Sequence, residues 1–237
     1  MHRRIFLKSA AITTSALLSH PLIAAEEAQK AQDKPNIVFL LIDDMGWTGT
    51  SVQLDPKQSA SKSDYYLTPN LERIAKEGAR FSRAYAPAPM CTPTRGSILL
   101  GQTPATSHIT FPGDANRQLK KQQYIPATNR NTLPKGASTI ASVLKANGYR
   151  TAHIGKWHMG RGCTPGDFGF DVHDGNTDNL SASPDDPKKT NDLTKRSIQF
   201  ITESKQNRKP FFLYLSYYAV HTPTEAKAET VAKFKVR

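Results

Sequence analysis

Apolar residues gather in short runs separated by polar segments, and three of these runs predict buried β-strands. They cover residues 36–42, 149–154 and 211–217, and each is nearly continuous rather than alternating. Continuous apolar runs are typical of parallel strands, because helices cover both faces of a parallel sheet. Residues 81–85 are a weaker candidate for a further short strand.

Between these runs, apolar residues recur at the spacing of amphipathic helices. One helix is predicted between Thr68, as its N-cap, and Gly78, with Pro69 at its first position. A second is predicted to begin at a Ser138 cap, and a third covers residues 193–204. Helices that alternate with parallel strands predict one α/β domain, a mostly parallel sheet flanked by helices.

Two carboxylates, Asp43 and Asp44, directly follow the first predicted strand. Open α/β sheets bind ligands at the carboxyl ends of their strands. Adjacent carboxylates repel each other, and a hard divalent cation with oxygen ligands would relieve that repulsion. A solvated turn is the alternative for an isolated Asp-Asp pair.

Three basic side chains follow the other two strands. Lys156 and His158 come after the second strand and point the same way if the backbone stays extended. An ammonium beside an imidazole suits anion binding and protonation of a leaving oxygen. His221 follows the third strand, where a lone histidine is more often structural. We expect all three to converge with the two aspartates at one sheet edge.

Cys91 begins the segment Cys-Thr-Pro-Thr-Arg, which predicts the start of a helix that ends at Gly101. The free N–H groups of the first turn and the guanidinium of Arg95 favour an oxyanion beside Cys91. A buried structural thiol is the alternative. A disulfide with Cys163, the other cysteine of the chain, would remove Cys91 from chemistry.

The first 25 residues are predicted to form an export signal. Arg-Arg-Ile-Phe-Leu-Lys at residues 3–8 resembles the twin-arginine motif, and residues 10–18 form an apolar core too short to span a bilayer. An amphipathic or uncleaved anchor is the alternative. We expect the twin-arginine machinery to export the protein to the periplasm or medium, and residues 26–35 to be a linker.

The formal net charge of +12 favours acidic partners. Sulfated glycans, nucleic acid and anionic surfaces all belong to that class, and a basic soluble surface is the alternative. Because no basic run with interleaved aromatic residues is present, we do not expect a nucleic-acid partner.

Three segments together resemble the sulfatase family of the alkaline-phosphatase superfamily. They are Cys-Thr-Pro-Thr-Arg from Cys91, Asp-Asp-Met-Gly from Asp43, and Gly-Tyr-Arg-Thr followed by Gly-Lys-Trp-His up to His158. The family usually has Ser where Thr94 stands and often Thr where Leu100 stands. The resemblance covers residues 36–237, expected to be the catalytic domain's N-terminal part.

The resemblance implies that Cys91 is converted to formylglycine by a formylglycine-generating enzyme. It also implies that Asp43, Asp44 and the modified Cys91 bind one divalent cation, calcium or alternatively magnesium. The expected activity is hydrolysis of a sulfate ester on a small molecule or glycan.

The resemblance assigns roles to the remaining site residues. A hydroxyl of the hydrated aldehyde at position 91 attacks the sulfur, while Arg95 and Lys156 stabilise the added charge. Lys156, His221 or His158 assists the departing alcohol, and His158 accepts the proton that releases sulfate.

The family pattern has further parts that we do not find in this sequence: a second, downstream metal pair, another lysine and a C-terminal subdomain. We therefore expect an incomplete metal shell and an apparently truncated domain. A formylglycine-dependent phosphodiesterase or phosphonate hydrolase stays open, as does an inactive polyanion-binding fragment.

Overall fold

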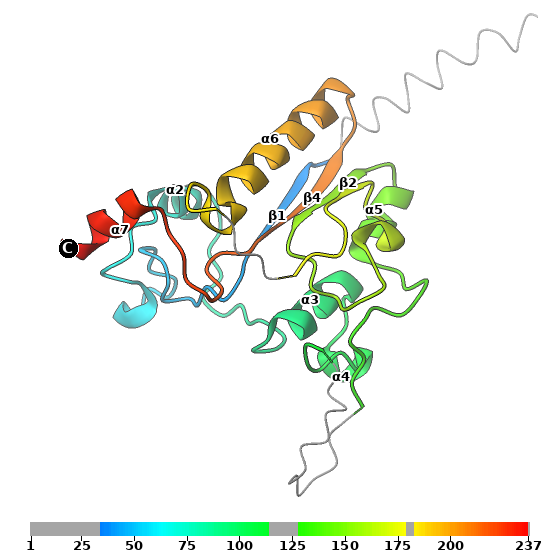
Figure 1. The fold of residues 1–237 in the computed structure, drawn as a ribbon, viewed down its shortest axis with the longest axis horizontal. Coiled ribbons are helices and arrows are strands. Elements are labelled where there is room, and N and C mark those ends of the chain that lie inside the picture. The colour runs from blue at the N-terminus through cyan, green and yellow to red at the C-terminus, as the bar shows by residue number, and fades with distance from the viewer. Residues whose placement is uncertain (1–33, 114–127, 179–182, 237) are drawn as a thin grey trace, which may run out of the picture.

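A computed structural model describes residues 34–113, 128–178 and 183–236, so the expected export signal and most of the linker lie outside the described residues. The described residues form a four-stranded parallel sheet in the order β1-β4-β2-β3 (Figure 1). The strands are β1 (Ile37–Ile42), β2 (Arg150–Gly155), β3 (Val172–His173) and β4 (Phe211–Tyr217). The three predicted strands are confirmed, and β3 is an additional short strand at the edge of the sheet.

β4 lies between β1 and β2, which explains its unbroken apolar sequence. Phe212 and Tyr214 pack into a cluster on one face, whereas Phe211, Leu213 and Leu215 pack into a second cluster on the other. Both faces are therefore covered, as a continuous apolar run requires.

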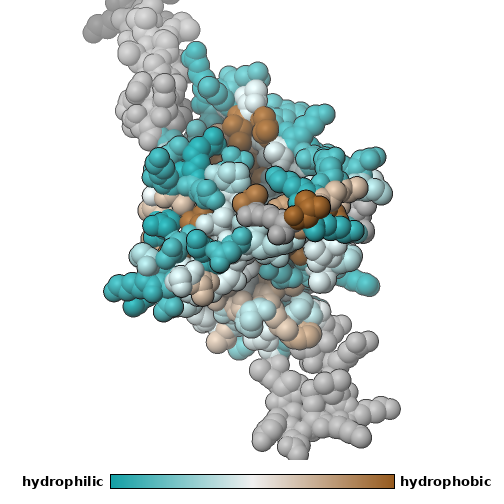
Figure 2. All heavy atoms as spheres, turned by 90° about the vertical axis from the view of Figure 1, so that its left-hand side faces the viewer, coloured by the Kyte–Doolittle hydropathy of each residue, from teal (hydrophilic) through white to brown (hydrophobic). Residues whose placement is uncertain are grey.

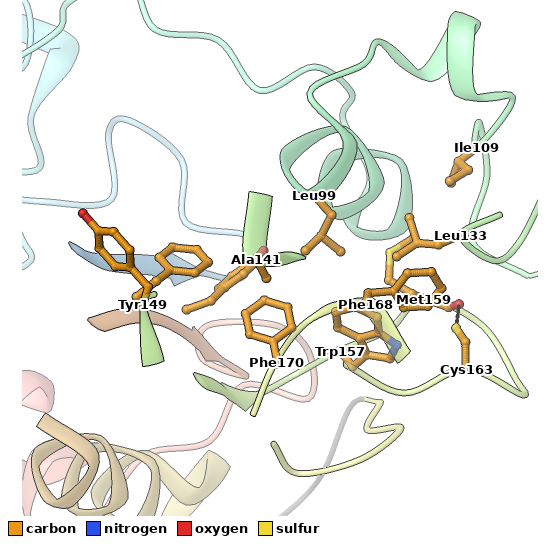
Figure 3. Close-up of a cluster of buried hydrophobic side chains, with 12 residues drawn as sticks. Leu99, Ile109, Leu133, Ala141, Tyr149, Trp157, Met159, Cys163, Phe168 and Phe170 are labelled. Atoms are coloured by element: carbon orange, nitrogen blue, oxygen red, sulfur yellow. Dashed lines mark hydrogen bonds between the residues drawn. The ribbon is translucent and has the colours of Figure 1, made fainter. Parts of the chain in front are cut away.

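Helices cover the two faces. α6 (Thr190–Gln206) packs on β4 and β2 through Leu193 and Phe200. α3 (Cys91–Leu100) and α5 (Ile140–Ala146) contribute Leu99 and Ala141 to the opposite cluster, whose aromatic centre is shown in Figure 3. This is the expected parallel sheet flanked by helices.

The remaining elements are short. They are α2 (Pro69–Glu77), α4 (Pro104–Ser107), α7 (Ala228–Lys235) and the 3-10 helices Ser59–Ser61, Pro165–Phe168 and Pro187–Lys189. Of these, the 3-10 helix Pro165–Phe168 contacts β3 and contributes Phe168 to the cluster around Phe212 and Tyr214. Figure 2 shows the side that carries α2 and α7: it is mostly hydrophilic, with separate hydrophobic groups between. Within the described ranges, no helix has the length and apolar character needed to cross a bilayer.

Three local predictions are corrected. Residues 81–85 form no strand, and both Phe81 and Tyr85 are largely exposed, because no neighbouring strand pairs with them in the described structure. The cap of α5 is Thr139 rather than Ser138, since its side chain accepts a hydrogen bond from the backbone N–H of Ser142. Thr68 stands at the N-cap position of α2 but makes no side-chain cap bond.

Candidate active site

The N-terminus of α3 holds Cys91 at its first position, and the predicted end of this helix is confirmed. Gly101 adopts φ 64° and its N–H caps the carbonyl of Ser97, a left-handed turn that suits glycine. Cys91 and Cys163 are both free thiols, and Cys91 is half-buried. The conceivable disulfide between them is therefore absent.

Asp43 directly follows β1 and is only 4% exposed, and two cations contact it. Its Oδ1 lies 3.1 Å from Nη2 of Arg95, and its Oδ2 lies 2.5 Å from Nζ of Lys156. Burial opposes ionisation, but the charge of Arg95 and the bond from Lys156 together hold the pKa of Asp43 below its usual value. The predicted convergence of Asp43 and Lys156 is confirmed, and Arg95 joins them.

Arg95 joins three strand ends. Besides Asp43, its Nη1 donates to the backbone carbonyl of Lys156 at 2.7 Å and to Oγ of Ser216 at 2.5 Å. The backbone of Gly155 runs so close to that of Ser216 that a Cβ would lie 1.9 Å from the Ser216 carbonyl oxygen. This close approach fixes the path of the backbone that leads into Lys156.

A cavity of about 370 Å³ opens in front of this network. Its lining includes Asp43, Asp44, Cys91 and Arg95. The sequence placed these residues on two separate segments, and the fold brings them to one site. His221 reaches the same place, with Nε2 3.7 Å from Oδ2 of Asp44.

The cavity matches part of the coordination shell of a hard cation. Asp43 and Asp44 supply carboxylate oxygens, which calcium and magnesium prefer, beside the expected modification site Cys91. However, the described residues contain no group of three His, Cys, Asp or Glu side chains that could hold a metal ion. Since calcium takes about six to eight oxygens, a bound cation would need further ligands.

His158 departs from the extended geometry that the sequence suggested. Its φ is 53°, so the chain turns after β2, and His158 does not point with Lys156. Lys156 is fully buried, whereas His158 lines another cavity of about 700 Å³ and its Nε2 lies 3.1 Å from Oδ1 of Asp178. Partial burial and then the charge of Lys156 lower the pKa of His158, which Asp178 opposes.

Sequence reasoning missed two residues of this site. Ser216 is the one polar residue in the apolar run of β4, and that contrast could have marked it. Asp178 follows β3 in an irregular segment, where no pattern distinguishes it. A left-handed turn at His158 is likewise unreadable from local sequence.

Comparison with known sequences identifies the chain's relatives. The profile of the Sulfatase family matches residues 35–237. N-acetylgalactosamine-6-sulfatase of Mus musculus is 30% identical over 85% of this chain and 43% of the relative. A protein named sulfatase from Formosa agariphila is 36% identical over 64% of this chain and 28% of the relative.

Solved structures with a similar fold include two proteins with bound sugars. Ps i-CgsB, solved in complex with k-i-k-neocarrahexaose, is similar with a TM-score of 0.68 and 27% identity, over 85% of this chain and 49% of that chain. BT4656, solved in complex with D-glucosamine-2-N,6-O-disulfate, is similar with a TM-score of 0.64 and 25% identity, over 86% of this chain and 38% of that chain. The chain thus spans less than half the length of these relatives. With the family profile matched over nearly its whole length, the chain belongs to the sulfatase family.

Proposed function

We propose that the protein to which this chain belongs hydrolyses sulfate esters, with formylglycine made from Cys91 as its reactive group. The observation that carries this proposal is the single cavity that Cys91, Asp43, Asp44 and Arg95 line. Membership of the sulfatase family supports the reaction type. The relatives' names and ligands support a sulfated sugar as the substrate class.

Separate roles in this reaction are proposed for individual residues of the chain. The first turn of α3 directs free N–H groups toward a sulfate at position 91, and Arg95 adds a fixed positive charge. Lys156, held by Asp43, provides a second charge beside the cavity. The oxygen supplied by position 91 attacks the sulfur, the ester S–O bond breaks, and the sugar hydroxyl leaves with a proton. His221, which lies beside Asp44, is a candidate donor of that proton.

His158 lies on the other cavity, so its proposed proton-accepting role requires it to turn toward position 91 or to act through water. A divalent cation, calcium or magnesium, held by Asp43 and Asp44 would neutralise the sulfate oxygens. A formylglycine-generating enzyme is the proposed modifying partner. Export by the twin-arginine route to the periplasm or medium is proposed from the signal-like residues 1–25.

The test is expression of the protein with a formylglycine-generating enzyme, followed by mass spectrometry of the peptide that contains Cys91. We expect loss of the thiol and gain of an aldehyde, together with turnover of a chromogenic aryl sulfate. Cys163→Ala should retain both properties, whereas Cys91→Ala should lose both. Turnover by protein whose Cys91 remains a thiol would contradict the proposal, and faster cleavage of aryl phosphate diesters would favour the phosphodiesterase alternative.

A further inference from the structure

The His158 cavity does not end at His158. A second cavity of about 820 Å³ shares Asn131 and Arg161 with it. The two walls touch at Gly160, with φ +77°, where a Cβ would lie 2.2 Å from the carbonyl oxygen of Asn131. The two cavities are therefore neighbours along one surface, which we call the basic trough; its basic and acidic lining residues are Arg130, Lys135, His158, Arg161, Asp167 and Asp178.

The trough begins one residue from the expected reaction centre. Thr92, the neighbour of Cys91, lines the His158 cavity, and its Oγ1 donates to the His158 carbonyl at 2.9 Å. A sugar whose sulfate ester reaches position 91 would therefore have the trough beside it.

Three cations line the second cavity: Arg130, Lys135 and Arg161, all exposed. Within the described part of the chain, none of them forms an ion pair with a carboxylate. Asp167 is the acidic residue of this lining, and its Oδ2 accepts bonds from the backbone and hydroxyl of Thr164 at 2.7 and 2.9 Å. The lining thus carries a surplus of positive charge without an internal counterion for these cations.

The floor beneath these cations is apolar and fixed. Leu133, Cys163 and Phe168 are buried members of the cluster around Trp157, as Figure 3 shows. Cys163 Sγ donates to the carbonyl of Met159 at 3.1 Å, which helps to fix the loop that carries Arg161. An apolar floor with cations at its rim suits a sugar ring that carries anionic substituents.

We propose that the basic trough binds an anionic sugar residue next to the one whose sulfate ester is cleaved. This inference rests on the proposed function and specifies its substrate as an oligosaccharide with a second sulfate or a carboxylate. The cavities have the size of ordinary ligand sites. The positive charge of the whole chain acts in the same direction by attracting polyanions.

Isothermal titration calorimetry on the purified chain tests the trough. The ligands are hexuronate–N-acetylgalactosamine disaccharides with one or two sulfates, the matching saccharides without the hexuronate carboxylate, and a short single-stranded DNA. The variant is Arg130→Gln/Lys135→Gln/Arg161→Gln. Its control, Lys57→Gln/Lys76→Gln/Lys195→Gln, removes the same charge from exposed residues outside both cavities.

We expect the second anionic group to strengthen binding by about tenfold, as a few exposed charge pairs would provide. The trough variant should lose that gain in affinity. The control should keep all of it, and the single variant Arg161→Gln should keep part of it. Equal affinity for one and two anionic groups, a gain that persists in the trough variant, or equally strong DNA binding would overturn the proposal. Aryl-sulfate turnover does not involve Arg130, Lys135 or Arg161, so it reports separately on the proposed reaction.

Discussion

At the scale of single residues, the site is organised by a buried charge cluster. Asp43, Arg95 and Lys156 carry one negative and two positive charges, all in side chains at most 5% exposed. The cluster thus has a surplus positive charge beside the cavity that contains Cys91. Removal of Asp43 would cost about 3–5 kcal/mol, since it leaves two buried positive charges without a counter-charge. These residues therefore serve the fold as well as the proposed chemistry.

His153 is a second buried titratable residue, on β2 and away from the cavity that contains Cys91. It packs against the rings of Tyr214, Trp157 and Phe170, and its Nδ1 has no hydrogen-bond partner among the described residues. Burial, and then the charge of Arg95, lower its pKa from 6.5 to about 3. The folded state consequently holds this imidazole neutral.

The pH dependence follows from that shift. Between pH 6.5 and about 3 the unfolded chain binds a proton at His153 and the folded chain does not, so stability is present above pH 6.5 and falls as the pH drops. The loss approaches about 1.4 kcal/mol per pH unit. We expect His153→Phe to remove this slope in urea unfolding at pH 7, 6 and 5. The exposed His173→Phe is the control, and an unchanged slope in His153→Phe would contradict the assignment.

At the scale of elements, the pairing of β2 with β4 at the ends of the two strands decides where Lys156 points. Gly155 ends β2 with φ +103°, and Lys156 N–H then donates to the Ser216 carbonyl at 2.9 Å. The ends of β2 and β4 are thereby joined, and Arg95 from α3 donates hydrogen bonds to both Lys156 and Ser216. The cluster thus depends on a backbone approach that only glycine allows.

Substitution of this glycine should therefore affect both stability and the site. A Cβ at residue 155 meets the Ser216 carbonyl, so we expect Gly155→Ala to destabilise by about 3 kcal/mol or more in chemical denaturation. Gly101→Ala is the control, because Gly101 also has positive φ but nothing within 4 Å of its Cβ position. Its cost should be only about 1–2 kcal/mol. Equal costs would show that the close approach to Ser216 is unimportant.

At the scale of the whole molecule, one edge of the sheet is uncovered. In the described structure β1 pairs with β4 alone, and α6 packs on β4 and β2 instead of β1. Val38 and Leu40 are consequently 44% and 52% exposed, and the apolar residues of α2 are exposed as well. Edge strands with apolar side chains favour association with further polypeptide.

We therefore expect the chain to self-associate, and Leu40→Lys to reduce that association without lowering the denaturation midpoint. Light scattering during size-exclusion chromatography measures the first property. The control is Ile198→Lys, which adds the same charge at an exposed residue on α6. If both variants reduce association equally, net charge rather than the β1 edge is responsible.

The sequence by itself determined the elements and the family. The strands at residues 36–42 and 211–217, the helix from Cys91 to Gly101, and the approach of Asp43 to Cys91 and Arg95 all follow from local pattern and from the rule that parallel strands end at one edge. Apolar periodicity and a glycine at the end of a helix are local signals, which is why these predictions are confirmed.

Tertiary structure alone decided how the polar side chains pair. Arg95 bonds Lys156 and Ser216, which lie 61 and 121 residues further along the chain, and no local pattern specifies such partners. It also turned His158 away from Lys156 and left residues 81–85 without a strand. The physical reason is the same in each case: a buried charge, a left-handed turn or an edge segment takes its conformation from whatever packs against it.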